Sequence, residues 1–128
     1  MKNFISILLL FVIISCQQTA DVTAENINEI FATQDFSISF RMSKEKGSSI
    51  SFREGYMTYK SDQGTQSVEL TNEDVLKINR FISEQYPLHD DAREAIPSIT
   101  IFTDTQKVTL KVPQYASKFR FLLNDLPL

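Results

Sequence analysis

Apolar and polar side chains alternate along residues 36–42, and this period of two restricts the segment to a β-strand with one buried face. The apolar set consists of Phe36, Ile38, Phe40 and Met42. Further strand patterns follow at residues 50–52, 56–60 and 66–70, and each intervening turn contains a glycine. Neighbouring strands joined by such short turns pair in an antiparallel manner. The sequence therefore predicts a four-stranded antiparallel meander.

A helical period replaces the alternation after Thr71. Thr71 and Asp74 have the spacing of an N-terminal capping box, and apolar residues then recur every three or four positions. Pro87 is expected to end this helix. Three more elements are predicted: strands at residues 99–103 and 108–112, and a closing amphipathic helix at residues 115–126.

Together these elements predict an α+β fold. It has a single antiparallel sheet, the chain order β-β-β-β-α-β-β-α, and two helices on one face. The other face is expected to be open and polar. Its residues would be Ser37, Ser39, Arg41, Ser51, Arg53, Thr100, Thr109 and Lys111.

The N-terminus carries an apolar run in which ten of the eleven residues from 4 to 14 are hydrophobic. At about 1.5 Å per residue, a helix of this length covers roughly 16 Å of a hydrocarbon core that is about 30 Å thick. The run is therefore too short for a comfortable membrane span. With Lys2 as a positive start, it is typical of a secretory signal peptide, which we assign to residues 1–15.

The run ends in Ile13-Ile14-Ser15-Cys16, which resembles the lipobox of bacterial lipoproteins. The resemblance implies that a diacylglycerol is attached to the sulfur of Cys16, that the chain is cut before Cys16, and that the new amine can also be acylated. Two or three fatty chains give durable anchoring, whereas one does not. Gln17 follows where an aspartate would signal retention in the inner membrane. The resemblance thus implies a cell-envelope location, at the outer membrane and facing the periplasm in a diderm cell.

The chain beyond the signal is expected to form one domain. Residues 16–34 would comprise the lipidated Cys16, a polar tether and a possible short helix, followed by a single α+β domain at residues 35–128. Cys16 is the only cysteine, so no internal disulfide can stabilise this domain. Loss of Lys2 with the signal changes the net charge from −3 to −4, which does not favour nucleic-acid binding.

Catalytic chemistry has one candidate centre, the stretch His89-Asp90-Asp91. The chain contains no second histidine that could complete a metal site, and no Gly-x-Ser-x-Gly motif surrounds any serine. We interpret the stretch as a solvated loop, and we predict neither enzymatic activity nor a metal or other cofactor.

The leading hypothesis is a lipid-anchored interaction or structural module that contacts an envelope protein or a peptide through its open sheet face or an edge strand. The candidate partner-binding residues are Arg41, Arg53 and Tyr56. One alternative is a protease inhibitor, because the order of elements is similar to that of emfourin-like inhibitors of metalloproteases. Another alternative is a small envelope enzyme centred on His89. The mature domain also resembles small envelope lipoproteins of unknown function.

Overall fold

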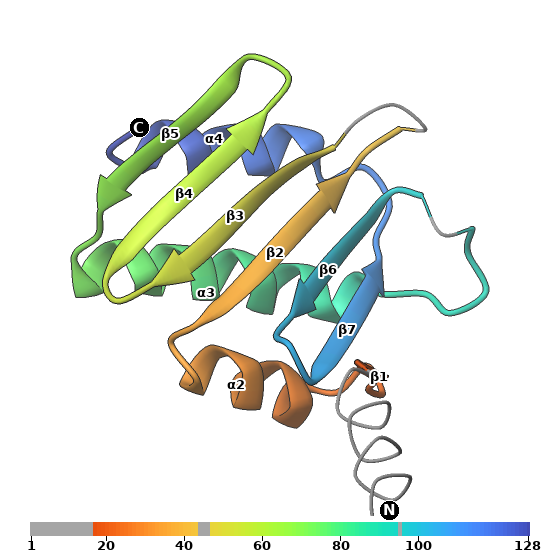
Figure 1. Ribbon diagram of the computed structural model, residues 1–128. Helices are drawn as coiled ribbons and strands as arrows, with labels where there is room; N and C mark the ends of the chain where they lie inside the picture. Colours follow the sequence, from red (N-terminus) through yellow and green to blue (C-terminus); the bar gives the residue numbers. More distant parts are fainter. Residues whose placement is uncertain (1–16, 44–46, 95) are drawn as a thin grey trace, which may run out of the picture.

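Seven strands form one mixed sheet in the spatial order β1-β7-β6-β2-β3-β4-β5 (Figure 1). The computed structural model describes residues 17–43, 47–94 and 96–128. The strands are β1 (Gln18–Thr19), β2 (Phe36–Arg41), β3 (Ser48–Arg53), β4 (Tyr56–Ser61), β5 (Gly64–Glu69), β6 (Ser98–Phe102) and β7 (Gln106–Lys111). Within these described residues, no helix is long and apolar enough to cross a membrane.

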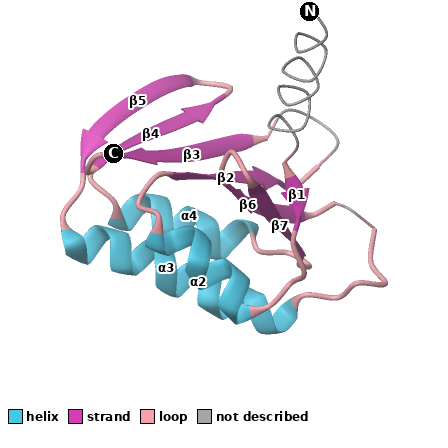
Figure 2. Ribbon diagram, turned by 60° about the horizontal axis from the view of Figure 1, so that its bottom comes forward, coloured by secondary structure: helices cyan, strands magenta, loops and turns pink. Residues whose placement is uncertain are grey.

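Helices cover one face of this sheet, and no helix of the described residues lies on the other face (Figure 2). They are α2 (Ala24–Ala32), α3 (Asn72–Gln85) and α4 (Ala116–Asp125), and a short 3-10 helix, η1 (Tyr86–Leu88), continues α3. Thr71 and Asp74 form the predicted capping box at the start of α3. Pro87 lies within η1, so the α-helix gives way to the 3-10 turn where the proline was expected to end it.

The alternating pattern of β2 determines which face of the sheet is buried. Phe36, Ile38 and Phe40 are at most 4% exposed, whereas the intervening serines are only partly buried. Gly47 permits the close approach of the chain to this strand, because a Cβ atom there would lie 2.2 Å from the carbonyl oxygen of Phe40. The buried side chains of the sheet and the three described helices form one hydrophobic cluster.

The expected α+β class with one sheet and helices on one face is confirmed, but three details of the prediction are wrong. The sheet is not fully antiparallel, because β1 pairs in parallel with β7. Three α-helices, not two, lie on the covered face of the described sheet, because the short helix considered within residues 16–34 forms as α2, buries Ile27 and Ile30, and packs near β6 and β7. The element order is therefore preceded by β1 and α2. A two-residue strand has no periodicity, and a nine-residue helix with two buried residues gives a weak pattern.

Tyr115 links the segment before α4 to strand β6 of the sheet. Its hydroxyl is buried and donates a hydrogen bond of 2.7 Å to the carbonyl oxygen of Ser98. We expect Tyr115→Phe to lower the free energy of unfolding by about 1 kcal/mol, because the Ser98 carbonyl loses this partner. Tyr56→Phe is the control, since Tyr56 is 55% exposed and should be neutral. Urea unfolding of residues 17–128 measures both effects, and equal stability of Tyr115→Phe and wild type would contradict the expectation.

The burial of the Tyr115 hydroxyl also predicts a pH dependence of stability. Burial raises the pKa of Tyr115 above its ordinary value of 10.0, although the backbone hydrogen bond with Arg41 acts in the opposite direction. The unfolded chain therefore releases this proton at a lower pH than the folded protein does. The stabilising contribution is complete below pH 10 and declines as the pH rises above it. The difference in unfolding free energy between wild type and Tyr115→Phe should accordingly be smaller at about one pH unit above 10 than at about one pH unit below 10.

Candidate functional site

The predicted anchoring residue lies outside the part of the chain that the structure describes. Cys16 and the signal peptide at residues 1–15 precede the first described residue, Gln17. The side-chain amide of Gln17 donates to the carbonyl oxygen of Thr103, in the turn between β6 and β7. The chain therefore contacts the sheet from its first described residue onward.

The three predicted partner-binding residues do not form one site. Arg41 ends β2 and pairs with Ser98, whereas Arg53 and Tyr56 pair with each other at the opposite end of the sheet. The Arg53 guanidinium lies 3.6 Å from the carboxylate of Asp35, and both side chains are more than 60% exposed. Such an exposed ion pair contributes little to stability. Arg41 instead lines a shallow hollow of about 390 Å³ on the open face, together with Lys60.

The open face is built largely from small hydroxyl side chains, as the alternation predicted. Three cross-strand pairs are hydrogen bonded: Ser37 with Ser51 at 3.1 Å, Thr58 with Ser67 at 3.0 Å, and Thr100 with Thr109 at 3.1 Å. These pairs satisfy part of one another's hydrogen-bonding capacity and hold the side chains in place. The face is therefore a polar surface without large projecting side chains along these pairs.

His89 holds the loop after η1 against β7. Its Nδ1 accepts the N–H of Lys111 at 2.9 Å, so the neutral ring carries its proton on Nε2, which lies 2.7 Å from the carboxylate of Asp91. The N–H of Asp90 also donates to the Lys111 carbonyl at 3.1 Å. Both ring nitrogens are thus engaged, and the contact of Nδ1 with the Lys111 N–H is the one that joins the loop to β7. No cluster of three potential metal ligands exists among residues 17–43, 47–94 and 96–128.

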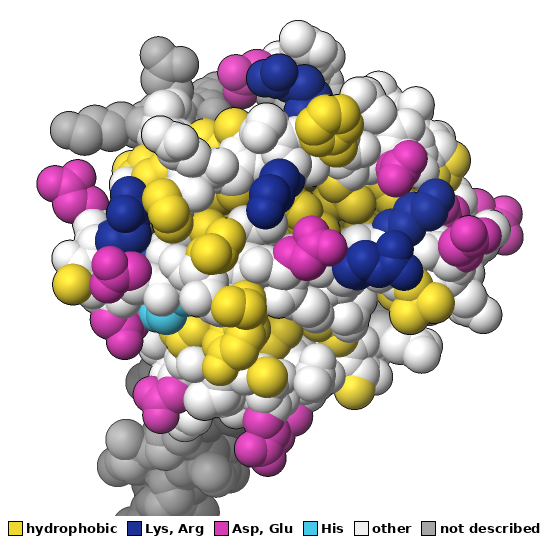
Figure 3. Space-filling view, turned by 180° about the vertical axis from the view of Figure 1, so that it is seen from behind, with side chains coloured by type: hydrophobic (Ala, Val, Ile, Leu, Met, Phe, Trp, Pro, Cys, Tyr) yellow, Lys and Arg dark blue, Asp and Glu magenta, His cyan; other side chains and the backbone are white. Residues whose placement is uncertain are grey.

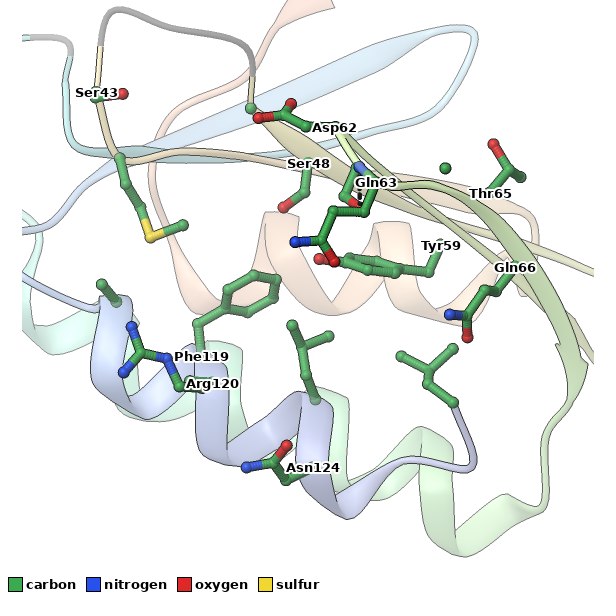
Figure 4. Close-up of a pocket in the computed structure, with 17 residues that line it drawn as sticks. Ser43, Ser48, Tyr59, Asp62, Gln63, Thr65, Gln66, Phe119, Arg120 and Asn124 are labelled. Carbon is green, nitrogen blue, oxygen red and sulfur yellow. Dashed lines mark hydrogen bonds between the residues drawn. The ribbon is translucent and has the colours of Figure 1, made fainter.

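A groove of about 890 Å³ lies between the β4–β5 hairpin and α4. Figure 4 shows Tyr59 and Gln63 reaching into it from the hairpin while Phe119 rises from α4. Figure 2 shows the reason for the gap, since the twisted hairpin diverges from the helical layer. Phe119 is 3% exposed, whereas Tyr59 and Leu123 are only partly buried. The floor of the groove is therefore aromatic and aliphatic.

Polar side chains surround this apolar floor. Gln66 lines the groove from β5, Asn124 and Arg120 line it from α4, and Asp62 lies in the turn of the hairpin. The two amides each offer a donor and an acceptor, while Arg120 and Asp62 add charges of opposite sign. A concave apolar surface with a few polar groups at its margin is the usual composition of a ligand-binding site.

The free edge of the sheet borders the same groove. β5 is the last strand in the sheet order, and Gly64, Thr65 and Gln66 of this strand line the groove. Leu70 donates its N–H to the carbonyl of Gly55, on the β4 side. Because backbone groups alternate along a strand, those of Thr65, Ser67 and Glu69 point away from β4. Within the described part of the chain, this edge therefore offers unpaired backbone donors and acceptors beside a concave surface.

The helix-covered face has a different character. Figure 3 shows hydrophobic, acidic and basic side chains interspersed on it. Leu76 on α3 is 62% exposed and Phe121 on α4 is 73% exposed. Single exposed apolar residues among charged ones are normal for a protein surface. This face is therefore a weaker candidate for binding than the groove.

Sequence reasoning did not find the groove. Tyr59 lies on the same face of β4 as Met57, because Met57 is fully buried and Tyr59 is partly buried against the same core. The closing helix predicted at residues 115–126 corresponds to α4, which supplies Phe119 and Leu123. No local pattern indicated the groove, because its lining comes from the β4–β5 hairpin and from α4, which are far apart in the sequence.

The loop clamp at His89 gives a second testable expectation. We expect His89→Ala to accelerate hydrogen–deuterium exchange at the amides of Lys111 and Asp90, and to lower the free energy of unfolding by about 1 to 2 kcal/mol, because the Lys111 N–H loses its acceptor. Asp91→Ala is the control, since this side chain is 91% exposed and should contribute little. Unchanged exchange at both amides in His89→Ala would show that the ring does not hold the loop.

No family model, no curated protein and no solved structure matched this chain when it was compared with known proteins.

Proposed function

We propose that the protein is a lipid-anchored, non-catalytic interaction module of the bacterial cell envelope, and that it binds an extended peptide segment of another envelope protein. The groove between the β4–β5 hairpin and α4, bordered by the free edge of β5, is the observation that carries this proposal. Anchoring is supported by the lipobox pattern that ends in Cys16.

Strand addition is the mode of binding that these features support. A peptide that pairs with β5 would satisfy the outward backbone groups of Thr65, Ser67 and Glu69. Side chains of such a peptide alternate in direction, so every second one would point toward Tyr59, Phe119 and Leu123. The edge gives affinity without a sequence requirement, and the groove selects apolar side chains at alternate positions.

The sequence of β5 supports the same mode. Exposed sheet edges are usually protected by lysine, proline or a covering segment. Gly64–Glu69 contains neither lysine nor proline, whereas at the other edge of the sheet β1 pairs with Gln106 and Lys107 of β7. An unprotected edge invites pairing with another chain. A physiological partner at this edge explains why it lacks such protection.

Arg41 is the predicted partner-binding residue that fits this site best. Its hollow on the open face shares Gly47, Ser48, Ser61 and Asp62 with the groove, so both lie at the same end of the sheet. Arg53 and Tyr56 lie at the other end. A peptide that leaves the groove past the β4–β5 turn would therefore meet the positive charges of Arg41 and Lys60, and we expect acidic residues there.

Ser67→Pro tests the strand-addition mode. Proline removes an N–H that points away from β4, so the β4–β5 pairing should survive while a bond to the partner is lost. Ser67→Ala is the matched control, because it keeps the N–H. A photo-crosslinking amino acid at Gln63 in the lipidated protein should yield one partner adduct in living cells. We expect at least a tenfold weaker adduct with Ser67→Pro, and equal weakening by both variants would contradict strand addition.

A second pair of variants tests the groove itself. Asn124→Trp should fill the space beside Leu123 and abolish the Gln63 adduct by steric exclusion. Ser117→Trp adds the same side chain to an exposed position of α4 that does not line the groove, and it should leave the adduct intact. An undiminished adduct with Asn124→Trp would place the partner elsewhere.

Cys16→Ser, analysed by metabolic labelling with palmitate, tests the anchor separately.

A further inference from the structure

The beginning of the described chain is fixed to the sheet and does not form a flexible linker. Gln17 donates its side-chain amide to Thr103, and the N–H of Gln18 donates to the carbonyl of Thr105 at 2.9 Å. The N–H of Ala20 then donates to β7 at 2.8 Å. Within the polar segment predicted to be a tether, residues 18–19 form a short strand that pairs with β7.

The next residues are also ordered by local bonds. Thr23 caps α2 by accepting the N–H of Asn26 at 3.1 Å, and the Asn26 side chain donates to the carbonyl of Asp21 at 2.9 Å. Helix α2 then buries Ile27 and Ile30 in the core. The path from Gln17 to β2 therefore contains no long segment without contacts to the domain.

This arrangement leaves almost no distance between the anchor and the domain. Consecutive Cα atoms are about 3.8 Å apart, so a lipid on Cys16 begins within one residue of Gln17. A flexible ten-residue linker would instead allow a separation of roughly 17 Å. We propose that the β6–β7 turn rests directly against the lipid headgroups and that the binding groove faces away from the bilayer. This inference depends on the proposed lipidation of Cys16.

The sheet places the two sites at opposite ends. β1 and the β6–β7 turn lie at the lower end in Figure 1, and the β4–β5 turn lies at the upper end. The strand pairing agrees, since Ser37 near the start of β2 pairs with Phe102, whereas Arg41 at its end pairs with Ser98. Six residues at about 3.3 Å each separate the two ends by roughly 20 Å. The strands therefore rise from the membrane, and the groove is presented to proteins in the adjacent compartment.

The charges at the anchored end indicate what holds it there. The strand ends and turns on this side carry Asp35, Arg53, Glu54, Glu69, Asp104 and Lys107. Acidic groups outnumber basic ones, so anionic lipids would not attract this end electrostatically. The covalent lipid and the hydrogen bonds of β1 must therefore hold the turn at the surface. The contact is consequently expected in zwitterionic vesicles and should depend little on ionic strength.

Two spin-labelled variants of the full-length lipidated protein test this orientation. Asp104→Cys and Gln63→Cys each place a label in an exposed hairpin turn, one at either end of the sheet. The protein is reconstituted in phosphatidylcholine vesicles that contain a nickel-chelating lipid, and the relaxation of each label by surface nickel is measured. We expect the label at position 104 to relax several-fold faster than the label at position 63. Equal rates would overturn the proposed orientation.

A linker variant provides the control. Ten Gly/Ser residues inserted between Cys16 and Gln17 should reduce relaxation at position 104 to the level at position 63, and an unchanged rate would show that β1 does not set the distance.

Vesicle flotation separates this proposal from the lipidation on which it rests. Protein that does not float, or whose Cys16 reacts with the spin label, would overturn the anchor and the orientation with it. Floating protein with equal relaxation rates would overturn the orientation alone.

Discussion

The stacking of Phe119 on Phe40 is the contact that relates the core of this protein to its candidate site. The two ring centroids are 4.1 Å apart, and Phe119 also lies within 6.1 Å of the ring of Phe81 on α3. The central strand β2 is thereby joined to both C-terminal helices. Since Phe119 also lines the groove, the position of α4, and with it the width of the groove, depends on this aromatic packing. Such a groove is formed before any ligand arrives, which lowers the cost of binding.

The two ends of the sheet have different constraints. At one end, the bonds of Gln17 and Gln18 to the β6–β7 turn fix the start of the described chain, and β1 pairs with the first two residues of β7. At the other end, the β4–β5 hairpin extends from the helical layer with its outer edge exposed. If a rigid strand and not a tether follows the anchor, the orientation of the domain on the membrane would also determine the direction in which the groove faces. His89 contributes to this rigidity by fixing the longest connection of the fold to β7.

Sequence patterns predicted those elements whose side chains face a single core. The alternation at Phe36–Arg41 and the capping box at Thr71 were sufficient for β2 and α3, because both signals are local. β1 was missed because its pairing depends on a turn more than eighty residues away. Likewise, alternation assigned Arg41 and Arg53 to the open face, but it carries no information about the sheet order. The groove required that order together with the twist of the hairpin, so no local pattern could have indicated it.

The orientation at the membrane also bears on which partner can use the β5 edge. Two copies of this chain would pair most simply through an isologous contact, in which their β5 strands run antiparallel about a two-fold axis. Antiparallel pairing would direct the β1 ends of the two copies in opposite directions. When both copies are anchored at β1 in the same membrane, with strands rising from it, only one of these ends can reach the surface. The proposed anchoring would therefore oppose self-association at the unprotected edge and leave it available to a segment of a different protein, whose direction is not constrained by this anchor.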